Sequence, residues 1–261
     1  MDTSRLYLWK RRTLYVGGEQ FSLRDINSAA SILLVALDQD LEVRIDQSAD
    51  SCISRSVLVP AGTAASGEAK GRVACLFLDP FLDQDLHPLQ RLMTRQTGLV
   101  FYDSSIESQQ VQAFQCILQE QLDPGSAYRL LCDRVLPVCG QIPSRPSVDQ
   151  RVEKVIDMLK AEHGVNVSNK VLAERVGVSS SQLQRLFKAA TGIPIRRYRL
   201  WHRLFEASVL IGLGRSLTDA AMEAGFSDSS HFTHTYYSML GLKPSAIMRG
   251  ESRTRILVGG D

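Results

Sequence analysis

The chain has 261 residues, 44% of them hydrophobic, and a formal net charge of only +2. This length suits one large domain or two ordinary ones, and the hydrophobic share is typical of proteins with packed cores. No apolar run reaches the roughly 18 residues of a membrane-spanning helix, and the N-terminal segment MDTSRLYLWKRR lacks the apolar stretch of a signal peptide. The composition argues against a membrane protein, and we expect a cytoplasmic one.

The charge is unevenly distributed along the chain. Residues 1–149 hold 14 Lys and Arg against 18 Asp and Glu, a net charge of −4, whereas residues 150–261 hold 16 against 10, a net charge of +6. A basic half joined to an acidic half is typical of a protein in which one domain meets a polyanion. Chance asymmetry fits such modest counts equally well.

The first hundred residues contain short segments that are rich in β-branched residues and separated by Gly, Pro, Asp and Ser. They are RTLYVG, SILLVAL, LEVRID, SVLVP and RVACLFLD. Evenly spaced strands of this kind predict an antiparallel barrel or sandwich. From about Pro88 the apolar period becomes helical, with one amphipathic helix over 105–122 and a second helix over 126–139.

A segment with two prolines and two serines, GQIPSRPSVDQ, indicates a linker before the second half. Beyond it the pattern is helical throughout, with Gly164 at one helix end and Ser168 as an N-cap. The predicted fold class is α+β. It comprises a β-rich domain over 1–140 (a cupin-like barrel over 1–87, helices over 88–140), a linker over 141–149, a helical domain over 150–250 and a flexible tail over 251–261.

Two segments of the helical half resemble each other. LAERVGVSSSQLQRLFKAATGIP (172–194) and DAAMEAGFSDSSHFTHTYYSMLGLKP (219–244) both combine a short apolar helix, a glycine, a serine-rich restart and an amphipathic helix that ends before another glycine. Gly177 and Gly192 correspond to Gly225 and Gly241 at separations of 48 and 49 residues, so the later segment has one extra residue. Each segment has the pattern of a helix–turn–helix, in which glycine permits the turn through a positive φ angle.

Serines and alanines support this interpretation. Ser179 and Ser227 can cap the second helix of each pair, and Ala173 and Ala221 allow the paired helices to approach closely. A generic helical hairpin shows the same turn chemistry. Because the duplication lies in the basic half of the chain, we favour DNA binding over a generic hairpin.

Residues 166–249 resemble the tandem helix–turn–helix domain of the AraC/XylS family of bacterial transcription regulators. The similarity is carried by LAERVGVSSSQLQRLFKAATG, YRLWHRLFEASVLIGLG and LTDAAMEAGFSDSSHFTHTYYSMLGLKPS. The last segment matches the family signature at Gly225, Phe226, Asp228, Ser230, Phe232 and Tyr236. The resemblance implies a sequence-specific, DNA-binding transcription regulator with reading helices at about 179–190 and 228–240 in successive major-groove segments. It also implies a cupin-like effector and dimerisation domain in front of them.

The helical period separates inward from outward side chains in both reading helices. Leu183, Leu186 and Phe187 form the inward stripe of one helix, and Phe232 and Tyr236 face inward in the other. Glutamine pairs well with adenine, and arginine with guanine or with a phosphate. The base-contacting candidates are Ser181, Gln184 and Arg185 in the first helix and, by the resemblance, Ser229, Ser230, His231 and His234 in the second.

Further polar side chains are candidates for phosphate contacts, which position a protein on DNA without selecting sequence. They are Ser180, Gln182, Lys188, Arg196, Arg199 and Lys243. An 18-residue helix from Ile195, made basic by arginines that include Arg197 and Arg203, would span about 27 Å and separate the reading helices by about one DNA turn. For any single arginine, an ordinary solvated surface is an equally good interpretation.

The histidines of the second reading helix depart from the common family pattern, because His234 stands where many relatives carry arginine. A neutral imidazole gives a weaker and more pH-sensitive contact. No cysteine or carboxylate completes a zinc site with His231 and His234, so we expect no metal and no cofactor.

The front half gives little indication of an effector. Only His87 precedes residue 150, so the histidine cluster of metal-dependent cupins is missing and a metal-free barrel is the better interpretation. Arg11 and Arg12 could meet an anionic small-molecule effector. A polar strand edge that discourages aggregation is the favoured explanation for both arginines.

The apolar stripe of the helix over 105–122 could pair two copies of the chain. Core packing produces the same stripe, but the family resemblance favours a homodimer formed through the N-terminal domain. The expected partners are double-stranded promoter DNA and, for an activator, RNA polymerase. Two alternatives remain open: a small-molecule enzyme of cupin type, which the front half does not support with any catalytic motif, and a helical adaptor that binds only proteins.

Overall fold

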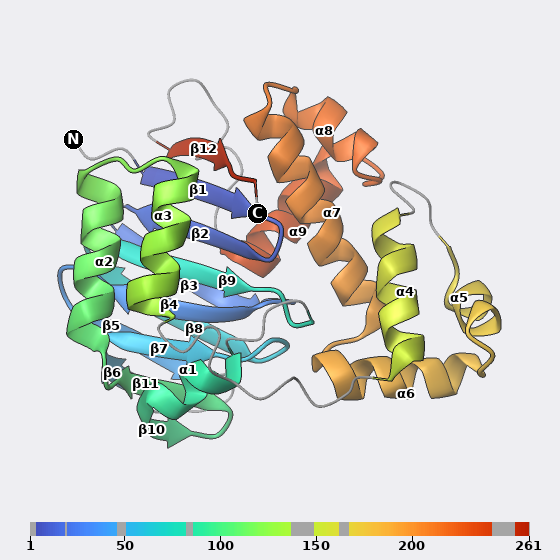
Figure 1. Cartoon of the computed structure of the whole chain (residues 1–261), viewed down its shortest axis with the longest axis horizontal. Coiled ribbons are helices and arrows are strands. Elements are labelled where there is room, and N and C mark those ends of the chain that lie inside the picture. Colours follow the sequence, from blue (N-terminus) through green and yellow to red (C-terminus); the bar gives the residue numbers. More distant parts are fainter. Residues whose placement is uncertain are drawn as a thin grey trace. The chain divides into compact units, whose positions relative to one another are not determined.

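The computed structural model describes residues 4–18, 20–45, 51–81, 86–136, 149–161, 167–241 and 254–260. The chain divides into two compact units (Figure 1). Residues 1–142 together with 237–261 form the sheet unit, and residues 143–236 form the helical unit. The chain thus leaves the sheet unit once and returns to it at its C-terminal end. Nearly all of the expected linker, up to residue 148, lies outside the described residues.

The larger sheet of the sheet unit has eight strands. In spatial order they are β10 (Met93–Thr97), β11 (Val100–Ser104), β7 (Ser56–Val59), β4 (Ser31–Ala36), β9 (Val73–Leu78), β2 (Arg12–Gly17), β1 (Ser4–Trp9) and β12 (Thr254–Val258). Neighbouring strands are antiparallel except for β1 and β12, which are parallel. All five segments predicted as strands are present, as β2, β4, β5, β7 and β9 of the structure.

The smaller sheet has four strands in the order β3 (Gln20–Asn27), β8 (Ala64–Lys70), β5 (Leu41–Ile45) and β6 (Ser51–Ser54). The prediction of a barrel is wrong, because the two sheets do not close on each other in the described part of the chain. The chain changes sheet directly after β2, where Gly17 and Gly18 both adopt positive φ angles. A β-carbon on Gly17 would lie 2.6 Å from the Ser4 hydroxyl, so only glycine fits this corner.

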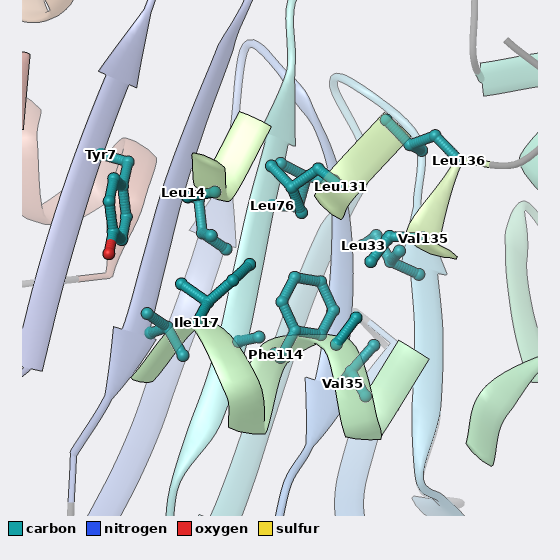
Figure 2. Packing of buried hydrophobic residues seen from close by; sticks show 14 of the residues in the cluster. Tyr7, Leu14, Leu33, Val35, Leu76, Phe114, Ile117, Leu131, Val135 and Leu136 are labelled. Carbon is teal, nitrogen blue, oxygen red and sulfur yellow. The ribbon is translucent and has the colours of Figure 1, made fainter. Parts of the chain in front are cut away.

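The core of the sheet unit lies between the larger sheet and the helices that cover it (Figure 2). Leu33 and Leu76 of the sheet share a buried cluster with Phe114 of α2 (Glu107–Gln119) and with Leu131 and Val135. The last two belong to a π-helical turn over Leu131–Val135 that continues α3 (Pro124–Leu130). A further short helix, α1 (Leu86–Leu92), precedes β10.

The apolar stripe of α2 serves this core. Val111, Phe114, Ile117 and Leu118 are all buried, with exposed fractions of 6% or less. Of the two interpretations of the stripe, core packing is therefore the one that the structure supports. A homodimer of this chain would need another surface.

The other face of the larger sheet is covered as well. Ile32 and Leu34 of β4 point to the smaller sheet and line a narrow apolar gap together with Ile26 of β3 and Val43 of β5. Because both faces are buried, β4 and β9 are apolar at nearly every position instead of alternating.

The C-terminal tail ends in a strand, which corrects the expectation of a flexible tail for the residues that the structure describes there. β12 pairs with β1 from Ser4–Thr254 to Leu8–Val258, and the N–H of Gly259 donates to the carbonyl of Leu8 at 2.9 Å. In Figure 1 the red β12 lies beside the blue β1. The segment TRILV pairs with the edge of β1, whose backbone N–H and C=O groups would otherwise have no partner strand on that side.

The helical unit contains α4 (Gln150–Ala161) and two helix–turn–helix repeats joined by the 18-residue α7 (Ile195–Gly212), except that the last residues of the second repeat, from Tyr237, are grouped with the sheet unit. The first repeat, residues 168–192, consists of α5 (Asn169–Arg175) and α6 (Ser180–Thr191). The second repeat, residues 216–241, consists of α8 (Leu217–Glu223) and α9 (Ser229–Leu240). α8 begins 48 residues after α5, and α9 begins 49 residues after α6, so the extra residue lies in the turn.

Candidate nucleic-acid interface

Both repeats begin and turn by the same backbone geometry. The Oγ of Ser168 accepts the N–H of Val171 at 3.3 Å, which caps α5 as predicted, and Ser216 caps α8 in the same way. Gly177 and Gly225 adopt φ angles of 69° and 85°, which confirms the prediction of positive φ in both turns. The residue after each glycine then donates its N–H back to the alanine of the preceding helix.

The second helix of each repeat is capped differently. Ser179 caps α6, its Oγ accepting a backbone N–H at 3.2 Å, as predicted. The cap of α9 is Asp228 and not the predicted Ser227, since the N–H of His231 donates to Asp228 at 2.7 Å. This N–H, assisted by the Ser227 hydroxyl, lowers the pKa of the Asp228 carboxyl. The extra residue of the second turn has moved the cap by one position.

α6 presents a polar face and buries an apolar one. Leu183 and Phe187 are fully buried and Leu186 is half-buried, so the predicted inward stripe is confirmed. The Phe187 ring meets the edge of Tyr198 at 5.6 Å between centroids, which fixes α6 against α7. The outward candidates are exposed (Ser181, Gln184, Arg185 and Lys188) or half-buried (Ser180 and Gln182).

α9 is packed through an aromatic cluster. Phe226 contacts the rings of both Phe232 and His231 edge-on at 5.3 Å, and Phe232 in turn contacts Tyr236. Ser230 and His234 are exposed, whereas Ser229 and His231 are half-buried. His231 is further held by Ser227, whose Oγ lies 3.1 Å from its Nδ1. His231 is therefore fixed in place, and His234 is the more accessible of the two imidazoles.

One exposed residue of α9 escaped the sequence-based selection. Thr233 lies 49 residues after Gln184 and is exposed like it. The offset between the two reading helices, applied residue by residue, would have identified Thr233 from the sequence.

The basic linker helix divides into surface and interior positions. Arg196 is exposed, and Arg199 donates from Nη2 to the carbonyl of Val167 at 2.7 Å, bracing α7 against the start of the first repeat. Arg203 is buried, and burial lowers the pKa of both Arg197 and Arg203. Arg203 thus does not belong to a basic surface, and Lys243 lies outside the described residues.

The two front arginines are not brought together as an anion site. Arg11 is exposed in the turn between β1 and β2. Arg12 is buried, with its guanidinium 5.3 Å from the Tyr128 ring centroid and its Nη1 3.5 Å from Cys132 Sγ. Arg12 therefore binds the sheet to α3. Across the described ranges, no group of three or more His, Cys, Asp or Glu side chains is arranged to hold a metal ion, and no helix is long and apolar enough to cross a membrane.

Comparison with known proteins assigns the repeats. Residues 172–250 match the family model described as a helix-turn-helix domain. The chain is 31% identical over 105 residues to the HTH-type transcriptional activator RhaS of Escherichia fergusonii, and this match covers 40% of this chain and 38% of RhaS. It is 28% identical over 161 residues to the virulence regulon transcriptional activator VirF of Yersinia enterocolitica, and this match covers 56% of this chain and 58% of VirF. The chain thus spans from about two fifths to somewhat over half of these relatives.

Two solved structures are similar to this chain. ToxT from Vibrio cholerae aligns over 90% of this chain and 97% of its own, with a TM-score of 0.56 at 12% identity, a likeness of fold alone. An AraC-type DNA-binding domain protein from Chromobacterium violaceum is 30% identical over 36% of this chain and 86% of its own, with a TM-score of 0.35. Through its two helix–turn–helix repeats, this chain belongs to the AraC/XylS family of transcription regulators.

Proposed function

We propose that the chain is a sequence-specific DNA-binding regulator of transcription, and that it activates its promoters by recruiting RNA polymerase. The observation that carries the proposal is the pair of reading helices, α6 and α9, each packed by aromatic residues on one side and polar on the other. On α6, Gln184 and Arg185 have the chemistry for adenine and guanine edges. α7 has the length to separate the repeats by about one turn of DNA.

The test is genomic DNA pull-down and sequencing with the full-length protein. We expect a motif of two blocks about one helical turn apart. Arg185→Ala should relax one block, losing about 1–3 kcal/mol of discrimination at the base it contacts. His234→Ala should relax the other block by a smaller amount, because a neutral imidazole makes a weaker contact. Enrichment without any motif would contradict sequence-specific reading, and a helical adaptor that binds only proteins would show no enrichment at all.

A second part of the proposal concerns the sheet unit, which we infer to bind an apolar effector between its two sheets. One solved form of ToxT is described as bound to an unsaturated fatty acid. In this chain the gap lined by Ile32, Leu34 and Val43 is apolar, but its volume of about 10 Å³ admits at most about one water. A fatty acid would enter only if the sheets moved apart.

Thermal denaturation tests the effector. An unsaturated fatty acid should raise the melting temperature of the wild-type protein, because a ligand at a hundred times its Kd stabilises by about 2.7 kcal/mol. Leu34→Phe narrows the gap and should abolish this rise, whereas Arg134→Ala, an exposed change in the same unit, should preserve it. An unchanged melting temperature in the wild type would remove the effector and leave the DNA-binding proposal intact.

We further propose a cytoplasmic homodimer formed through the sheet unit. The family resemblance supports it, and the burial of the α2 stripe requires a different contact surface. Light scattering on the full-length protein measures the oligomeric state directly, and a monomer at micromolar concentration would contradict the dimer. RhaS and VirF are both transcriptional activators, which favours a regulator over the enzyme alternative.

A further inference from the structure

The two repeats can be compared position by position, because their helices begin and end in register. α5 and α8 are offset by 48 residues, and α6 and α9 by 49. The additional residue lies between Gly225 and the cap Asp228, where the first repeat runs directly from Gly177 through Val178 to its cap Ser179. Equivalent side chains therefore occupy equivalent places on the two pairs of helices.

This comparison shows a consistent difference in charge. The first repeat has four cationic side chains, all exposed, and none of them has a cationic counterpart in the second repeat. Lys170 corresponds to Thr218, Arg175 to Glu223, Arg185 to His234, and Lys188 to Tyr237.

The net charges are accordingly opposite. The first repeat has four Lys and Arg and one Glu, a net charge of +3. The second repeat has three exposed acidic residues, Asp219, Glu223 and Asp228, and no Lys or Arg, a net charge of −3. Arg215 immediately precedes the second repeat, and Lys243, outside the described residues, follows it. DNA repels the acidic groups and attracts the cationic ones, so the two repeats cannot bind it by the same means.

We propose that the two repeats divide DNA binding between them. The first repeat supplies the cationic contacts to phosphates, and α9 reads bases through neutral side chains, Ser230, Thr233 and His234, without releasing counterions of its own. This inference rests on the proposed function and refines it. The second repeat then contributes specificity but little of the salt-sensitive affinity, and its exposed acidic residues help to reject DNA that offers no matching bases.

The dependence of affinity on salt measures this division. The affinity constant K falls as salt rises, and each cation that neutralises a phosphate of B-DNA makes the fall of log K with log salt steeper by about 0.9. The slope given below is the absolute value of this dependence. We would titrate the full-length protein with its two-block site between 50 and 200 mM salt, at pH 8 to keep imidazole protonation out of the comparison. A change of 0.9 in slope corresponds to about 3.5-fold in affinity over this fourfold range.

A reciprocal exchange at one equivalent position gives the sharpest design. Lys188→Ala should lower the slope by about 0.9, whereas Arg185→His should lower it by less, because this side chain is proposed to contact a base. His234→Arg should raise the slope and tighten binding. His234→Ala should leave the slope unchanged while weakening the preference for the second block. Arg134→His removes the same charge from an exposed site of the sheet unit and serves as the matched control, with no change in slope.

Two results would overturn the division of labour. An unchanged slope in His234→Arg would mean that α9 does not lie against DNA, and a slope lowered by about 0.9 in His234→Ala would mean that His234 already acts as a cationic contact. Neither result resembles failure of the proposed function, in which the wild-type protein would retain no DNA at 50 mM salt.

Discussion

The packing of α6 makes a quantitative prediction for Phe187→Ala. The ring is fully buried and meets Tyr198 edge-on at 5.6 Å, and its loss leaves a cavity that the rigid neighbours fill poorly. Phe→Ala changes in protein cores cost about 3–5 kcal/mol, and an edge-to-face aromatic pair contributes about 0.5–1.5 kcal/mol beyond burial. We therefore expect the helical unit to lose about 4 kcal/mol, a large part of the roughly 5–13 kcal/mol typical of a domain of this size.

The two tryptophans provide the assay, because Trp9 lies in the sheet unit and Trp201 in the helical unit, both buried. In a Trp9→Phe background, Trp201 fluorescence follows urea unfolding of the helical unit alone. With an m value of about 1.3 kcal/mol/M, Phe187→Ala should lower the midpoint by about 3 M. Lys188→Ala, an exposed change on the same helix, should alter stability by less than about 0.5 kcal/mol. A loss below about 1.5 kcal/mol for Phe187→Ala would show that α6 is not held by this ring.

Three further predictions concern a helix cap, an ion pair and the last strand. Ser179→Ala should cost the helical unit about 1 kcal/mol in the same fluorescence assay, because α6 loses its N-cap acceptor. The Arg72 guanidinium lowers the pKa of Asp38 by hydrogen bonding. The pair therefore stabilises the fold at pH values above the unfolded-state pKa of Asp38, and this contribution is lost as the pH falls through the lower folded-state pKa. In melting curves from pH 6 to 2, Asp38→Asn should lose less melting temperature on acidification than the wild type. Gly259→Ala would place a β-carbon 2.5 Å from the Trp9 ring. We therefore expect the free energy of unfolding to fall by about 1–3 kcal/mol and the backbone amides at the edge of β1 to exchange hydrogen faster. Unchanged exchange would contradict the packing of Gly259 against Trp9.

Local signals in the sequence predicted the helical half well. Glycines with positive φ, serine caps and a 3.6-residue apolar period act within a few residues of one another, and Ser168, Gly177 and Ser179 all have the predicted roles. The duplication added a second, independent instance of the same pattern. The cap of α9 could not be predicted in this way, because Asp228 and Ser227 are equally good acceptors and only the backbone path through the longer turn decides between them.

Long-range pairing was less predictable. Five strands were identified from their composition, but whether they close into a barrel depends on which edges pair, and no local signal specifies that. The burial of Arg203 has the same origin: a single arginine in an amphipathic helix gives no indication of which face its neighbours cover. The contact between Arg12 and Cys132 joins residues 120 positions apart and was equally out of reach.

The pairing of β12 with β1 has a consequence for synthesis on the ribosome. Ser4 and Thr254 are partners in the sheet although 250 residues separate them. Translation at about 5–20 residues per second places the emergence of β12 roughly 8–30 s after that of β11. During this interval the larger sheet ends at β1 with a free edge while the DNA-binding repeats are made. The first unit to appear is thus the last to be completed, and a ribosome that stops short of residue 254 releases a chain with an open strand, the form that chaperones and proteases recognise.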